Sequence, residues 1–135
     1  MREIKEIIIH CADTPEGRDV RSDEIRKWHK AKGWNDIGYH YVIDLDGTIE
    51  AGREPDVVGA HCNGHNSNSL GICYVGGCDE NMKPKDTRTE AQKDSLLCLL
   101  KFLRLKYPKA QIFGHRDFAQ KACPSFDAKN EYKDL

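Results

Sequence analysis

Three residues that lie far apart in the sequence have side chains that could bind one transition metal. His10 ends an apolar run, and His115 and Cys123 lie in the segment GHRDFAQKACP, residues 114–124. Two imidazoles and one thiolate are typical zinc ligands, and a set of three leaves a fourth tetrahedral position open for water, as in catalytic zinc sites. Lys121 comes two residues before the cysteine, so it would lie near such a metal. These residue types predict an open zinc site, provided that the fold brings them together.

A second group of possible ligands competes with this set. His61, Cys62 and His65 lie close together in a loop rich in Gly and Asn. Adjacent residues in such a loop point in different directions, and the group has no fourth ligand, so it is the weaker candidate for a zinc site. A single histidine at a strand end, such as His10, can also be an ordinary surface or capping residue.

The composition is typical of one domain spanning residues 1–135. Lys and Arg number 21 and Asp and Glu 22, for a formal charge of -1, so no charge excess indicates binding to nucleic acid or to an anionic membrane. No apolar stretch approaches the roughly 20 residues of a membrane span. The first residues also lack the apolar core of a signal peptide, so we expect synthesis in the cytoplasm.

The six cysteines are expected to be reduced, because no export signal accompanies them. If Cys123 binds a metal, five remain, and an odd number cannot pair completely. Cys73 and Cys98 are expected to be buried as small apolar side chains.

Apolar patterns predict strands and helices in alternation. Five strands are expected at residues 4–10, 39–44, 48–51, 70–75 and 110–114, the second and third being joined by the hairpin signal Asp46-Gly47. A first helix is expected from Ser22, as N-cap, to Gly33. A second helix has overlapping capping boxes at Thr87 to Glu90 and Thr89 to Gln92 and ends before Pro108. A further helical turn is expected after Asp127.

These elements predict an α/β fold with a single mixed β-sheet of about five strands and helices packed on it. His10 and His115 would lie at strand ends and Cys123 on a following loop, so all three could meet over one edge of the sheet. The second helix carries apolar residues on a wide stripe that includes Leu97, Cys98, Phe102 and Leu105, and is therefore expected to be mostly buried. His40 alternates with Tyr39 and is expected to face the other side, hydrogen-bonded within the fold.

Five separated segments, in order along the chain, resemble one known family. They are GYHYVI (38–43), DGTIEAGR (46–53), VGAH (58–61), NSNSLGI (66–72) and KACPSFD (121–127). The chain resembles the zinc-dependent N-acetylmuramoyl-L-alanine amidases of the peptidoglycan-recognition-protein superfamily, and most of all the small phage lysozymes of the T-seven type. The likeness extends from about His10 to Asp127.

The resemblance implies specific roles for specific residues. His10, His115 and Cys123 match the family's ligands for one Zn²⁺ per chain, and Tyr39 and Lys121 match its catalytic tyrosine and lysine. The implied reaction is hydrolysis of the amide between the lactyl group of N-acetylmuramic acid and L-alanine, so the expected partner is peptidoglycan with its stem peptide. No carboxylate pair stands out as the acid and nucleophile of a glycosidase.

The expected chemistry gives each of these residues a task. Zinc would polarise the amide carbonyl and lower the pKa of water from about 15.7 towards about 7. Lys121 is expected to stabilise the oxyanion, whereas Tyr39 could orient water or donate a hydrogen bond, and its role is left open. His61 and Asn66, on a segment that lines the substrate groove in this family, are expected to contact the substrate.

Two other functions remain as alternatives. Some superfamily members bind peptidoglycan without cleaving it, and these usually lack the cysteine ligand, which is present here as Cys123. Phage relatives can also inhibit an RNA polymerase, but no surface for that role is identifiable in the sequence. We therefore expect a monomeric enzyme that acts on the cell wall after release by lysis or by another export route.

Overall fold

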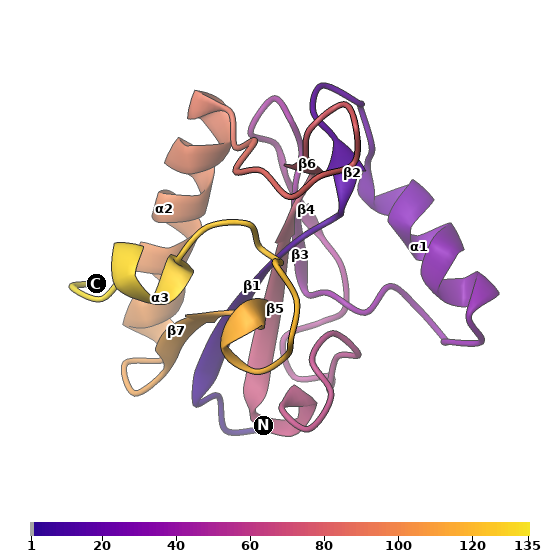
Figure 1. Cartoon of the computed structure of the whole chain (residues 1–135). Helices are drawn as coiled ribbons and strands as arrows, with labels where there is room; N and C mark the ends of the chain where they lie inside the picture. Colours follow the sequence, from indigo (N-terminus) through magenta and orange to yellow (C-terminus); the bar gives the residue numbers. More distant parts are fainter. Residues whose placement is uncertain (1) are drawn as a thin grey trace.

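The computed structural model describes residues 2–135 and contains a five-stranded mixed sheet (Figure 1). The strand order is β4-β3-β5-β1-β7, with β4 alone antiparallel to its neighbour. The strands are β1 (Glu6–Cys11), β3 (Tyr41–Ile43), β4 (Ile49–Ala51), β5 (Ser69–Tyr74) and β7 (Gln111–Gly114). The predicted α/β class and mixed sheet of about five strands are confirmed.

A second, much smaller sheet lies beside the first. Strand β2 (Thr14–Pro15) pairs in parallel with β6 (Gly77–Cys78), and both lie outside the five strands expected from the sequence. The Thr14 hydroxyl accepts a hydrogen bond from the backbone N–H of Gly76 at 3.0 Å. Two-residue strands carry no apolar alternation, so the sequence pattern could not reveal them.

Helices cover both faces of the main sheet (Figure 1). Helix α2 (Glu90–Lys106) packs on one face through Leu96, Leu100 and Leu103, which share a buried cluster with Ile7 and Ile9 of β1. Helix α1 (Ser22–Ala31) contributes to a separate cluster on the other side. The central strands β1 and β5 are therefore almost wholly buried, as apolar strands in a parallel arrangement usually are.

The helix starts differ slightly from the predicted ones. The N-cap of α1 is Arg21, and Ser22 is the first helical residue. Ser22 does not cap the helix because its N–H and hydroxyl both donate to the Glu50 carboxylate, at 2.9 and 2.8 Å. For α2 the second of the two predicted capping boxes forms, with Thr89 as N-cap and Gln92 as its partner.

The outer face of α2 contradicts the prediction that this helix is mostly buried. Phe102 is 56% exposed and Leu105 is 85% exposed, and Leu97 and Cys98 are exposed as well. The helix contacts the sheet with one face only, so side chains on its opposite face remain in solvent. The prediction of burial is thus wrong for Cys98 and correct for Cys73, which is fully buried on β5.

A buried arginine joins the segment before α2 to the C-terminal helix α3 (Ala128–Glu131). Arg88, whose side chain is 3% exposed, forms ion pairs with Asp86 at 2.9 Å and Glu131 at 2.8 Å. Its guanidinium also lies 3.4 Å from the centroid of the Phe126 ring. These contacts fix the chain immediately after the loop that carries Cys123.

Replacing Arg88 with methionine should lower the free energy of unfolding by about 3 kcal/mol. The two acids would keep their charges without a partner, and the value lies at the lower end of the expected range because both are partly exposed. Denaturant unfolding followed by circular dichroism measures the change, with Arg18→Met, which removes an exposed ion pair to Glu24, as the control. Equal stability of the two variants would refute this account of Arg88.

No helix within residues 2–135 has the length and apolar character needed to cross a membrane.

Candidate metal centre and groove

The two histidines are positioned by neighbouring parallel strands. His10 lies near the end of β1, and His115 directly follows β7 as the first residue of a 3-10 turn, His115–Asp117. Ile9 is in register with Gly114, so the two histidines come next to each other at the same edge of the sheet. The predicted convergence of two strand ends is therefore present.

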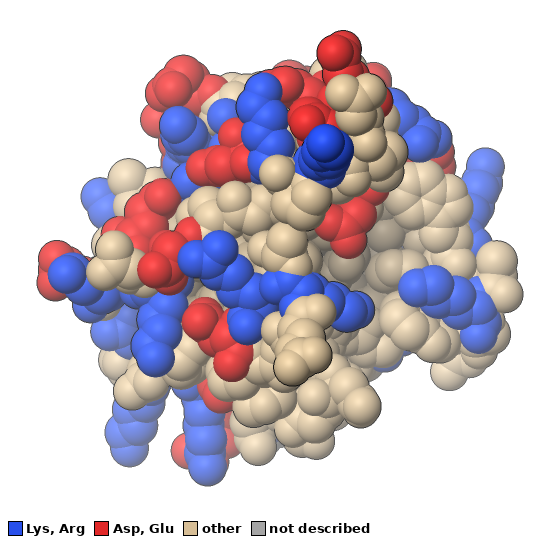
Figure 2. Space-filling model, viewed as in Figure 1, with Lys and Arg blue, Asp and Glu red and all other residues tan. Residues whose placement is uncertain are grey.

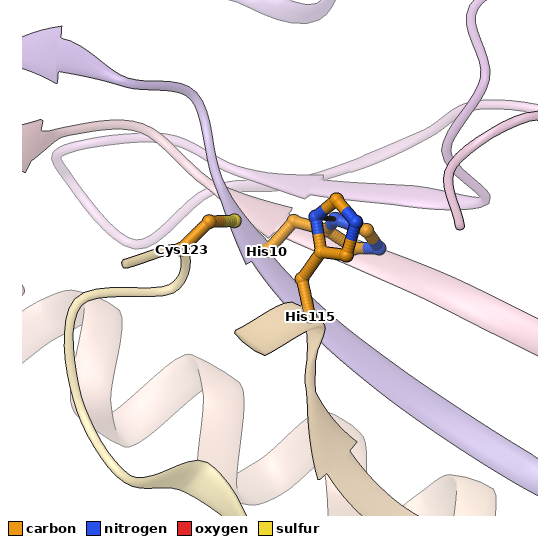
Figure 3. Close-up of side chains that lie close together, drawn as sticks. All are labelled: His10, His115 and Cys123. Atoms are coloured by element: carbon orange, nitrogen blue, oxygen red, sulfur yellow. Dashed lines mark hydrogen bonds between the residues drawn. The ribbon is translucent and has the colours of Figure 1, made fainter. Parts of the chain in front are cut away.

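Cys123 reaches the same place from the loop that follows. Its Sγ accepts a hydrogen bond from the backbone N–H of Cys11 at 3.2 Å, which anchors the loop to the end of β1. The loop is closed by the N–H of Arg116, which donates to the carbonyl of Cys123 at 2.7 Å. Figure 3 shows the side chains of Cys123, His10 and His115 pointing toward one another.

The donor set fits a transition metal. One ligand atom from each of His10, His115 and Cys123 lies within 4.8 Å of the others, and no other such group of His, Cys, Asp or Glu occurs among residues 2–135. The two Nδ1 atoms face each other at 3.1 Å. Two imidazole nitrogens and a sulfur that converge in this way are suited to a soft or borderline cation such as zinc.

The surroundings keep both imidazoles neutral, as metal ligands must be. Burial lowers the pKa of His10 well below its usual 6.5, and the neighbouring His61 and His115 lower it further. Burial also lowers the pKa of His115, with Lys121 adding to the effect.

The competing group of ligands does not assemble. His61 points to His10, whereas the Nδ1 of His65 lies 3.0 Å from a carboxylate oxygen of Glu6. The His65 ring stacks on Phe118 with a centroid distance of 3.9 Å. His61, Cys62 and His65 therefore do not form a metal site.

A groove of about 660 Å³ reaches the metal-ligand group at His115. Figure 2 shows the surface hollowed between the side of α1 and the loops of the C-terminal part. The groove is lined by His29, Lys32, Trp34, Tyr39, Ala60, His61, Cys62, Asn63, Asn66, His115, Phe118, Ala119 and Lys121. Five of the seven predicted site residues thus line one groove: Tyr39, His61, Asn66, His115 and Lys121.

Tyr39 and Lys121 lie on different parts of this groove. Tyr39 precedes β3, and its ring centroid is 5.1 Å from that of His10. Burial raises the pKa of the Tyr39 phenol well above its usual 10, so the hydroxyl keeps its proton at neutral pH. Lys121 is exposed on the loop between His115 and Cys123, and it lines the groove.

The two predicted substrate-contact residues also make contacts within the protein. His61 is 9% exposed, and its Nδ1 lies 2.8 Å from the Nε2 of His10. The side-chain oxygen of Asn66 accepts the backbone N–H groups of His61 and Cys62, both at 2.9 Å. His40 is hydrogen-bonded within the fold as predicted, since its Nδ1 accepts the N–H of Gly71 at 3.1 Å.

Sequence reasoning missed part of the groove wall. His29, Lys32, Trp34 and Phe118 line it, although none was proposed as a site residue. Trp34 and Phe118 could have been noticed, because each is a large aromatic residue among polar neighbours, and both are half-buried in the structure. His29 gave no such signal, because its position fits a helix face.

A comparison with known protein families identifies the family of this chain. The profile of the N-acetylmuramoyl-L-alanine amidase family matches residues 1–126. The chain belongs to the N-acetylmuramoyl-L-alanine amidase family. The endolysin of Escherichia phage T7 is 49% identical to this amidase over 123 residues, which cover 91% of the chain and 82% of the endolysin.

Solved structures agree with the assignment of this amidase. The amidase LysC from Clostridium intestinale superposes with a TM-score of 0.82 at 32% identity, covering 96% of this chain and 82% of LysC. A variant of Drosophila PGRP-LB in complex with tracheal cytotoxin gives a TM-score of 0.82 at 26% identity, covering 100% and 83% of the two chains. The protein is an N-acetylmuramoyl-L-alanine amidase, which hydrolyses the amide between N-acetylmuramic acid and L-alanine in peptidoglycan.

Proposed function

We propose that this amidase binds one Zn²⁺ per chain through His10, His115 and Cys123, and that this site carries out the hydrolysis. The observation that carries the proposal is the convergence of the three ligand atoms within 4.8 Å. Two neutral imidazoles and one thiolate would leave the site with about one net positive charge, so the metal would remain a strong Lewis acid. When bound, zinc would polarise the amide carbonyl and lower the pKa of a water molecule towards about 7.

Lys121 is proposed to stabilise the negative charge that develops on the amide oxygen. Lys121 lines the groove and belongs to the loop that the hydrogen bond from Arg116 to Cys123 closes. A cation beside the carbonyl oxygen would stabilise the negative charge that forms there in the transition state. Stabilising that charge lowers the barrier to hydrolysis.

Tyr39 is proposed to donate a hydrogen bond rather than to act as a base. A phenol with a pKa near 10 is protonated at neutral pH, so it offers an O–H donor. Its ring packs beside His10 and lines the same groove as Lys121, so the two donors approach a bound amide from different elements.

The groove is proposed to bind the muramyl group and the stem peptide of peptidoglycan. The likeness to PGRP-LB with bound tracheal cytotoxin supports this proposal. His61 and Asn66 stay predicted substrate contacts, and both line the groove. We further propose that residues 1–135 form one catalytic domain, which works as a monomer and reaches the cell wall after release by lysis or another export route.

Elemental analysis of the purified, dialysed protein tests the metal proposal. We expect one zinc per chain, and no comparable amount of iron, copper or nickel. A protein that is fully active and contains no metal would contradict the proposal.

A further inference from the structure

Both ring nitrogens of His10 are engaged, and they face different partners. Nδ1 faces the Nδ1 of His115 at 3.1 Å, on the side of the three-ligand group. Nε2 lies on the other side, 2.8 Å from the Nδ1 of His61, in a buried contact. His10 itself is 1% exposed, so no solvent competes for this contact.

This arrangement determines where the hydrogens lie. If Nδ1 of His10 offers its lone pair to a metal, the ring hydrogen is on Nε2, and the Nδ1 of His61 must accept it. The hydrogen of His61 is then on its own Nε2, which lies 3.1 Å from the hydroxyl oxygen of Ser69. A single direction of donation therefore runs from His10 to His61 to Ser69.

Two glycines leave space for the ring of His61. A Cβ added at Gly71 would lie 2.6 Å from the Cγ of His61, and one at Gly59 would lie 2.9 Å from its Cδ2. The two glycines therefore leave space that the ring fills. Asn66 fixes the start of the loop by accepting the N–H of His61. His61 is only 9% exposed, so most of its surface is in contact with the protein and a small part lines the groove.

We propose that His61 is a positioning residue for the metal centre: it accepts the Nε2–H of His10 and so fixes the tautomer and orientation of that ligand, while Ser69 fixes His61. The inference rests on the proposed zinc site. A ligating histidine usually donates its second N–H to a carboxylate, a backbone carbonyl or water, and loss of that partner typically weakens metal binding by about 10- to 100-fold. In this chain the partner is an imidazole, supplied from a loop 51 residues away in sequence.

Two substitutions of His61 separate the roles of its two nitrogens. The carboxamide oxygen of asparagine reaches roughly the position of the ring Nδ1, whereas that of glutamine reaches the position of Nε2. His61→Asn keeps an acceptor for His10, and His61→Gln removes it. We expect zinc dissociation constants, measured by competition with a chromophoric chelator, to stay within about threefold of wild type for His61→Asn and to rise about 10- to 100-fold for His61→Gln.

A role of His61 in substrate contact alone would give the opposite pattern. In that case His61→Gln, saturated with zinc, would show a raised KM with unchanged zinc affinity, and this result would overturn the inference. If the wild-type chain binds no zinc, the metal proposal itself fails. If the wild type binds zinc and His61→Gln binds it equally well, only the positioning role fails.

The tautomers can be observed in the unmutated protein, so the inference does not depend on a variant that folds. A ¹⁵N-edited NMR spectrum that correlates ring nitrogens with ring hydrogens should show His10 protonated at Nε2 and His61 protonated at Nε2 in the zinc-loaded chain. A hydrogen on the Nδ1 of His61 would overturn the proposal, because that nitrogen could then not accept from His10.

Discussion

Replacing Cys123 with serine should abolish both zinc binding and release of stem peptides. Cys123 is 5% exposed and would supply the thiolate of the proposed ligand set. A serine hydroxyl is a poor zinc ligand, so the site would keep only two imidazoles. The contribution of a catalytic metal is several kcal/mol, which at about 1.36 kcal/mol per tenfold corresponds to a loss of at least about 1,000-fold in kcat/KM.

Cys98→Ser is the matched control, because it makes the same substitution at an exposed thiol on the outer face of α2. It should keep one zinc per chain and full activity. Thermal unfolding of both variants shows whether the fold is retained. If Cys123→Ser keeps its metal and its activity, Cys123 is not a ligand.

Replacing Lys121 with alanine should lower kcat by about 100- to 1,000-fold, the loss typical of removing one oxyanion donor. The zinc content should stay at one per chain, because Lys121 is not in the ligand group and its side chain is exposed. KM should change little, because the ammonium is proposed to interact with the negative charge that forms in the transition state and not with the bound substrate. Kinetics on purified peptidoglycan, with metal analysis of the same samples, measure these quantities.

Lys83→Ala serves as the control for Lys121→Ala, since Lys83 is exposed and does not line the groove. It should match the wild type in kcat and in zinc content. If zinc is lost from Lys121→Ala, the lysine has a structural role in holding the metal loop. If kcat is unchanged, the oxyanion role is wrong.

The positions of His10 and His115 at strand ends were the part of the site that the sequence predicted best. His10 and His115 each follow a short apolar run, and such runs predict strands whose ends deliver side chains to one edge of a sheet. The strand order could not be read from the sequence. The pairing of β1 with β7, which places Ile9 beside Gly114, is what brings the two histidines together.

Long-range contacts through loops were the part that the sequence could not predict. The contact of His61 with His10 depends on a loop path fixed by Asn66 and on the space above Gly71. Neither has a periodic signal in the sequence. The exposed face of α2 could not be predicted either. An apolar stripe indicates which residues of a helix could be buried, but not how many other elements pack against the helix.

Reconstitution of the metal-free chain tests the central claim most directly. The protein is stripped with a chelator and titrated with Zn²⁺ while new amino termini and new reducing sugar ends are counted in digests of purified peptidoglycan. We predict that the stripped protein is inactive, that activity returns and saturates at one equivalent of zinc, and that every new end is an L-alanine amino terminus. Full activity of the stripped protein, or new reducing ends in place of L-alanine termini, would contradict the account.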